Sequence, residues 1–369
     1  MFSRFTVSPR AVASSFLVVF AFLATALTAG AASITASAGG ATPDQTVQLM
    51  QYFPGTLTIG VGDTVTWTMN ATEPHTISFG KPPFPPGSDQ AFAPAGGNSF
   101  DGTNFVNSGL LFAANAAPPG AATKFSLTFT QPGTFTYSCL IHPNMTGKVV
   151  VQPAGTAYPP SQASYQATND PVYTAAISAG QSSIATQKVT TKKNPDGSTT
   201  YVMAAGWGDG KSYAVLRFGA NNLTIHASDS VQWSQQDPNE VHTVTFLNNG
   251  QDVPFLLPNN TTNPVAVRPA GGTTYSGSGF FNSGLLLPVG TPPQVGPSSY
   301  TLKFDRPGTY NYLCILHDDQ GMKGTLTVLG ATAALPRTGG IPESAGLGVG
   351  LIGLLLVGSG LFLKRRAQA

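Results

Sequence analysis

The feature that most constrains this chain of 369 residues is an internal repeat. Three residues recur 175 positions later: Asn107 as Asn282, Cys139 as Cys314, and His142 as His317. The surrounding sequence recurs as well. The segment NSGLL precedes both cysteines, and a Pro-Gly pair occupies the positions seven and six residues before each of them. A repeat of this length predicts two copies of one fold.

Each copy carries potential metal ligands in one short loop, in the order Cys-x2-His-x2-Met or Cys-x2-His-x4-Met, with one more histidine upstream. One thiolate, two imidazoles and a weak axial thioether are the ligands of a blue-copper electron-transfer site. The thiolate suits Cu(I) and the imidazoles suit Cu(II), so the set serves both oxidation states. The predicted ligands are His75, Cys139, His142 and Met145 in the first copy, and His242, Cys314, His317 and Met322 in the second.

Each of these residue types also has an ordinary interpretation. A lone histidine is usually a surface residue, a lone methionine belongs to the core, and two exported cysteines form a disulfide. A Cys139–Cys314 disulfide would need Cα atoms within about 7 Å, which equivalent inward positions of two separate repeats do not favour. The repeated order of ligands favours metal binding. Thr76 and Thr243, next to the first histidines, are candidates for bracing the cysteine loops or for ordinary strand threonines.

Composition and alternation indicate an all-β chain. It has 42 glycines and 30 prolines, and only 9% of its residues are charged, which is typical of a turn-rich β protein. Alternating apolar residues at Leu57, Ile59, Val65 and Trp67, on either side of a turn, predict a hairpin with one buried face. A sparsely charged body of this kind gives no basic surface for nucleic acid, and no binding motif for a small-molecule substrate is evident.

These ligand motifs resemble those of the cupredoxins, the family of plastocyanin, amicyanin and pseudoazurin. The first loop is similar to that of amicyanin, and the second to those of plastocyanin and pseudoazurin. The resemblance implies two tandem Greek-key β-sandwich domains, each with one type 1 copper at one end. It also implies that His142 and His317 reach the surface and pass electrons to donor and acceptor redox proteins.

The resemblance also bears on enzymatic activity, because two-domain cupredoxins include nitrite reductases and small laccases. Those enzymes need three or more further histidines, whereas only His226, expected as an exposed strand residue, is left over from five. We therefore expect an electron carrier and not an enzyme. Copper capture or delivery, and a surface module without a redox role, are the alternatives.

The expected segments follow from composition. They are a signal peptide over 1–31, the first domain over 32–152, a linker over 153–185, the second domain over 186–330, a stalk containing LPRTG over 331–340, a transmembrane segment over 341–363 and a basic cytoplasmic tail over 364–369. The protein is thus expected outside the cell, held by the membrane helix or attached to the cell wall by a sortase that cleaves between Thr338 and Gly339.

Overall fold

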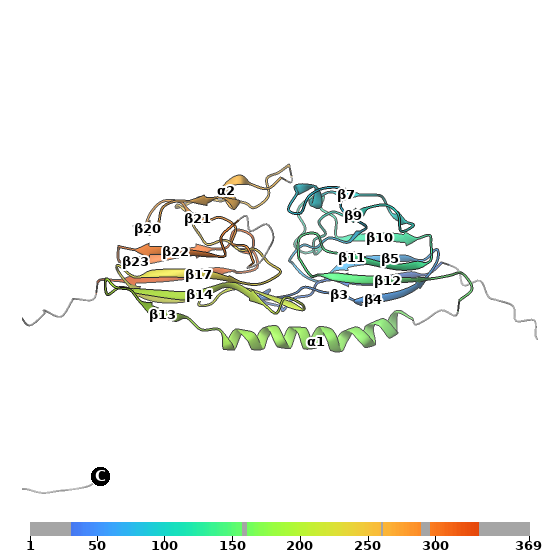
Figure 1. The fold of residues 1–369 in the computed structure, drawn as a ribbon, viewed down its shortest axis with the longest axis horizontal. Helices are drawn as coiled ribbons and strands as arrows, with labels where there is room; N and C mark the ends of the chain where they lie inside the picture. Colours follow the sequence, from blue (N-terminus) through green and yellow to red (C-terminus); the bar gives the residue numbers. More distant parts are fainter. Residues whose placement is uncertain (1–30, 157–160, 260, 289–295, 332–369) are drawn as a thin grey trace, which may run out of the picture. The chain divides into compact units, whose positions relative to one another are not determined.

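The computed structural model describes residues 31–156, 161–259, 261–288 and 296–331, which are mostly β-strand with few helices (Figure 1). The helices of this part of the chain are α1 (Gln162–Thr186), α2 (Pro264–Val267) and the 3-10 helix η1 (Asp89–Phe92). Both repeats belong to one compact unit, Met1–Ala331. The expectation of a β protein is confirmed.

The first repeat forms two sheets. One has the strand order β3-β1-β5-β10-β8 and the other β4-β12-β11-β6-β9-β7. The strands of the first sheet are β1 (Ser33–Ala38), β3 (Tyr52–Phe53), β5 (Thr64–Met69), β8 (Ser99–Phe100) and β10 (Lys124–Phe129). Those of the second are β4 (Thr56–Gly60), β6 (Ser78–Phe79), β7 (Pro94–Ala95), β9 (Val106–Ser108), β11 (Gly133–Ser138) and β12 (Thr146–Gln152).

The second repeat has the same plan, with sheet orders β2-β15-β14-β17-β22-β20 and β16-β24-β23-β18-β21-β19, and with β13 paired to β14. The first of these sheets contains β2 (Val47–Leu49), β13 (Thr190–Lys193), β14 (Thr199–Gly208), β15 (Tyr213–Phe218), β17 (Ser230–Gln236), β20 (Thr274–Tyr275) and β22 (Ser299–Phe304). The second contains β16 (Asn222–His226), β18 (Thr245–Phe246), β19 (Pro269–Ala270), β21 (Phe281–Ser283), β23 (Gly308–Leu313) and β24 (Lys323–Leu329).

The predicted alternation is present, but the predicted hairpin is wrong. β4 and β5 bury alternate residues as expected. They do not pair with each other, because β4 pairs with β12 and β5 pairs with β1 and β10. The turn at Gly62 and Asp63 therefore leads from one sheet to the other, and both strands turn their apolar side to the same core.

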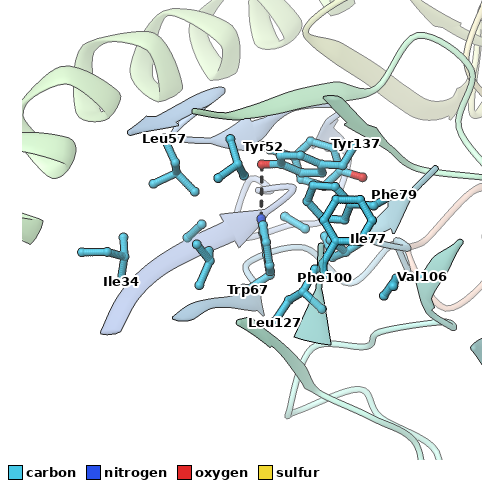
Figure 2. Close-up of a cluster of buried hydrophobic side chains, with 14 of the residues drawn as sticks. Ile34, Tyr52, Leu57, Trp67, Ile77, Phe79, Phe100, Val106, Leu127 and Tyr137 are labelled. Atoms are coloured by element: carbon cyan, nitrogen blue, oxygen red, sulfur yellow. Dashed lines mark hydrogen bonds between the residues drawn. The ribbon is translucent and has the colours of Figure 1, made fainter. Parts of the chain in front are cut away.

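A tryptophan lies in the middle of each core. In the first repeat the buried Trp67 packs against Phe79 and Tyr137, and its indole N–H donates to the hydroxyl of Tyr137 at 3.2 Å (Figure 2). Tyr137 lies on β11, the strand that ends one residue before Cys139. The aromatic core thus holds in place the strand that delivers the predicted thiolate ligand.

The connection between the repeats is helical, where a linker without regular structure was expected. Helix α1 covers 25 residues and contains Pro171 (Figure 1). Its Ala176 lies in a cluster with Val47 of β2 and Trp207 of β14. No apolar period marks this segment in the sequence, because small residues such as Ala176 and Gly180 make the buried contacts.

Strand β2 joins the two repeats directly. It precedes most of the first repeat's core strands, yet it pairs antiparallel with β15 of the second repeat, with Val47 opposite Val215 and Leu49 opposite Tyr213. Strands β13 and β14 pair antiparallel as a hairpin around Asn194 and Gly197. Trp207, which has no counterpart in the first repeat, donates its indole N–H to Ser183 of α1 at 2.9 Å.

The predicted segments at the two ends fall largely outside the described residues. The signal peptide over 1–31, apart from its last residue, and the stalk, transmembrane segment and basic tail after Ala331 belong to this part. Among the helices that the structure describes, none has the length and apolar character required to cross a membrane.

Candidate metal centres

The structure brings together three of the predicted ligands of the first repeat. The Nδ1 atoms of His75 and His142 lie 2.8 Å apart, and the sulfur of Cys139 lies 3.5 Å from Nδ1 of His142 and 4.0 Å from Nδ1 of His75. These side chains are all buried. Three donor atoms that face one another in this way fit a metal ion bound by one thiolate and two imidazoles.

The second repeat builds the same arrangement. Nδ1 of His242 lies 3.0 Å from Nδ1 of His317, and the sulfur of Cys314 lies 3.4 Å from the latter. The ligand atoms of these residues all lie within 4.8 Å of one another. Both cysteines are free and buried, so the structure contains no Cys139–Cys314 disulfide.

Backbone pairing fixes the upstream histidines and the loops. His75 exchanges both backbone hydrogen bonds with Leu111, and His242 does the same with Leu286. The two leucines end the repeated segment NSGLL, which explains why this segment recurs together with the ligands. Each loop is closed by a hydrogen bond from the backbone N–H of the cysteine to the methionine carbonyl, at 3.0 Å in both repeats.

The methionines are buried at the ends of these loops. Met145 is 1% exposed and Met322 is fully buried. Their role as axial ligands remains a prediction. His226, the histidine without an assigned role, is half-buried at the end of β16, where an exposed residue was expected.

The two threonines brace the cysteine loops, as one of the two hypotheses stated. The backbone N–H groups of Thr76 and Thr243 each donate to the sulfur of the cysteine in the same repeat at 3.3 Å. Their hydroxyls accept from the backbone N–H that follows the cysteine, of Leu140 and Ile315 respectively, at 2.8 Å. Each threonine therefore fixes both the thiolate and the start of the loop.

Replacing Thr243 by valine is expected to destabilise the metal-free second repeat by about 1–3 kcal/mol, because the buried N–H of Ile315 loses its acceptor. Urea-induced unfolding of the metal-free protein measures this change. Thr243→Ser keeps the hydroxyl and serves as the control. If the serine and valine variants unfold at the same urea concentration, the hydroxyl does not brace the loop.

Neighbouring charges set the protonation of the ligands. Burial would raise the pKa of the Cys139 thiol, but His142 and His75 outweigh it and hold that pKa well below its usual value. Burial, together with the charge of His317, lowers the pKa of His242 well below its usual value. Burial lowers the pKa of His142 and His317, but the charges of the nearby glutamates and cysteines outweigh it and hold both pKa values well above the usual value. Thiolate and neutral imidazole are the forms that bind metal, so these two histidines give up a proton when a metal ion binds.

The loop histidines are buried, whereas the resemblance implied that they reach the surface. His142 is 2% exposed and His317 is fully buried. Nε2 of His142 lies 3.1 Å from a carboxylate oxygen of Glu240, and Nε2 of His317 lies 3.6 Å from one of Glu73. Glu240 belongs to the second repeat and Glu73 to the first. Each histidine is therefore covered by a glutamate of the opposite repeat and not by solvent.

Neither glutamate was predicted from the sequence, although a signal was present. Glu73 precedes His75 by two residues, and Glu240 precedes His242 by the same spacing. The repeated Glu-x-His pattern therefore marks them. Its meaning depends on the contact between the repeats, which no pattern within one repeat predicts.

The chain is similar to known copper proteins. The model of copper binding proteins of the plastocyanin/azurin family matches residues 41–152. Amicyanin of Paracoccus denitrificans is 34% identical over 107 residues, which are 28% of this chain and 60% of amicyanin. Plastocyanin of a Synechococcus species is 33% identical over 102 residues, which are 27% of this chain and 62% of that protein.

Two further relatives give the extent of the similarity. Amicyanin-alpha of Methylorubrum extorquens is 29% identical over 133 residues, covering 36% of this chain and 91% of that protein. A solved structure of an oxidized amicyanin mutant is 26% identical, with a TM-score of 0.21, over 32% of this chain and 81% of its own. The chain thus spans about three fifths of the amicyanin of Paracoccus denitrificans and of the plastocyanin.

Proposed function

This chain is a cupredoxin, related to the copper-binding plastocyanin/azurin family, and from that premise we propose that it carries single electrons with one copper ion in each repeat. The observation that carries the proposal is the pair of buried Cys-His-His sets, in which one sulfur and two Nδ1 atoms face one another. The family match covers the first repeat. The second is included because it repeats the ligands and the strand order.

Copper bound in such a site supplies a one-electron couple. The protein's part is to keep the ligand geometry unchanged between the two oxidation states. His75 and Cys139 adjoin the paired strands β6 and β11, and each is fixed by backbone hydrogen bonds. Thr76 holds the cysteine sulfur and the loop after it at the same time. A site held from several elements rearranges little, which favours fast electron transfer.

Burial of the ligands favours an electron carrier over a protein for copper capture or delivery. The cysteine and histidine ligands are between 0% and 5% exposed. Handing over a metal ion requires ligands that an acceptor protein can reach, whereas an electron can pass through a thin layer of protein. The partners we propose are therefore a donor and an acceptor redox protein, and the carrier itself is not an enzyme.

We also propose that the protein is exported and held at the outer surface of the cell. The support is the sequence of the two ends, where a basic and apolar leader precedes the repeats and LPRTG, an apolar segment and a basic tail follow them. Fractionation of the cells that make this protein would test this proposal. Recovery of the protein from the cytosol would contradict it.

The Cys139→Ser and Cys314→Ser variants test the copper sites. The unaltered protein is expected to bind two copper ions and to absorb strongly in the visible range, because a copper–thiolate bond gives that colour. Each single variant should keep about half of the copper and of the absorption, and the double variant should keep neither, since hydroxyl does not replace thiolate as a ligand.

Copper content, visible absorption and electron paramagnetic resonance measure these outcomes on one sample. Ser138→Ala, one residue before the first cysteine, is the matched control and should behave as the unaltered protein. Rapid reduction, followed by transfer of the electron to a small redox protein, tests the carrier function itself. A protein that stays colourless with Cu(II) would disprove the assignment.

A further inference from the structure

Four ionisable side chains meet where the repeats touch. Glu240 lies 3.1 Å from Nε2 of His142 and 3.7 Å from Nε2 of His317. Glu73 lies 3.6 Å from Nε2 of His317 and 3.8 Å from Nε2 of His142. For each carboxylate, the closer imidazole belongs to the other repeat. We call Glu73 and Glu240 the carboxylate pair.

The carboxylate pair is almost entirely withdrawn from water. Glu73 is 6% exposed and Glu240 is 3% exposed. Among the described residues, the basic groups within 4.0 Å of them are the imidazoles of His142 and His317. A buried carboxylate that has no hydrogen-bond donor or cation beside it lowers the stability of the fold by several kcal/mol. The two imidazoles are therefore the groups that can donate to the pair: the contact between His142 and Glu240, at 3.1 Å, is within hydrogen-bond distance, and the others are longer ion-pair contacts.

The carboxylate pair selects one form of each imidazole. Nδ1 of His142 faces Cys139 and His75, whereas Nε2 faces Glu240. An imidazole that keeps its hydrogen on Nε2 for the carboxylate presents a free lone pair on Nδ1, which is the atom facing the other metal ligands. Nδ1 of His317 likewise faces Cys314, and its Nε2 lies 3.6 Å from Glu73, an ion-pair contact longer than a hydrogen bond.

A third buried carboxylate, Asp237, lies beside the pair and accepts from the backbone N–H of Glu240 at 3.3 Å. Burial and the charge of Glu240 raise the pKa of the neighbouring Asp237 to about 7. The site is therefore one in which negative charge is concentrated and the imidazoles offset it.

We propose that Glu73 and Glu240 are positioning residues that act across the boundary between the repeats, so that each repeat completes the metal site of the other. This inference rests on the proposed function, because it assumes that Nδ1 of each loop histidine binds copper. Each glutamate also lies two residues before the upstream histidine of its own repeat. A change at one site is thereby transmitted to the other, and the two copper sites form one coupled pair.

A metal ion held by Glu73, Glu240 and His317 is the competing assignment, since their ligand atoms lie within 4.8 Å of one another. It would require Nε2 of His317 to lose its hydrogen while Nδ1 binds copper. We therefore assign contacts between imidazole and carboxylate, without a metal ion, to this cluster. The number of metal ions that the protein binds distinguishes the assignments, because a third tightly bound ion that is lost in Glu240→Gln would overturn ours.

The decisive experiment uses the full-length Cys314→Ser protein, in which only the first site can bind copper. In this background Glu240→Gln is expected to weaken Cu(II) binding by about 10–100-fold, as loss of a carboxylate behind a ligating histidine does. Glu73→Gln should have a smaller effect, because its carboxylate lies farther from His142. The midpoint potential should rise in Glu240→Gln, since a neutral amide favours the oxidised site less than a carboxylate.

Asp252→Asn, which removes an exposed negative charge from the same repeat, is the control and should leave the affinity nearly unchanged. If Glu240→Gln leaves both affinity and potential as the control does, the inference is wrong while the copper assignment stands. If the Cys314→Ser parent itself binds no copper, the proposed function fails first, and the inference with it.

A measurement without copper covers the case in which Glu240→Gln does not fold. Nuclear magnetic resonance of the metal-free, otherwise unaltered protein should show Nε2–H protons of His142 and His317 that exchange slowly with water. Exchange as fast as that of a free imidazole would overturn the proposal.

Discussion

Replacing Gly206 by alanine is expected to abolish copper binding at the second site and to leave the first site intact. Gly206 lies in β14 at a break in register, with a φ of +72°. A Cβ atom there would overlap Nε2 of His242, one of the proposed copper ligands. The imidazole would have to leave the position in which its Nδ1 faces His317, so the copper content should fall from two ions per chain toward one.

The matched control separates this overlap from backbone strain. Gly250 also has a φ of +72°, but a Cβ atom there would meet nothing within 4 Å. Gly250→Ala thus has only the strain of a left-handed alanine, about 1–2 kcal/mol, and should bind both ions. If Gly206→Ala and Gly250→Ala bind the same amount of copper, Gly206 is needed for its backbone conformation and not to leave room for His242. Gly39 has the equivalent place in the first repeat, with a Cβ position 2.5 Å from Nε2 of His75.

Replacing Trp233 by alanine should destabilise the second repeat by about 3–5 kcal/mol, the cost of a large cavity in a packed core. Trp233 is fully buried, and its ring lies 5.2 Å from that of Tyr312 and 6.1 Å from that of Phe246. Tyr312 lies on β23, which leads directly into Cys314. The cavity is therefore expected to loosen the copper ligands as well as the fold.

Urea unfolding of the metal-free protein measures the loss of stability, and copper affinity measures the effect on the site. Val265→Ala, which trims an exposed apolar side chain, is the control. Trp67→Ala should have a similar cost in the first repeat, because it is buried in the same way. A Trp233→Ala protein that unfolds with the control would mean that the core tolerates the loss.

The sequence predicted what each repeat contains. Alternating apolar residues indicated the positions of β4 and β5, and the order of the ligands was enough to predict both Cys-His-His sets. The sequence did not show which strands pair. A turn between two alternating strands looks the same whether the chain returns in one sheet or crosses to the other, because both strands bury one face.

The contacts between the repeats were not predictable for a different reason. Helix α1 buries small residues such as Ala176, which give no apolar period. Strand β2 is three residues long and pairs with a strand of the other repeat. Glu73 and Glu240 acquire a role only when two surfaces meet, so their spacing within each repeat says nothing about the partner.

Strand β2 has a consequence for how this chain can be divided. A fragment that begins after the helix would keep β15 without the strand that covers its edge. Uncovered edges invite pairing with other chains and aggregation. The second repeat moved alone into another chain is therefore expected to aggregate through the exposed edge of β15.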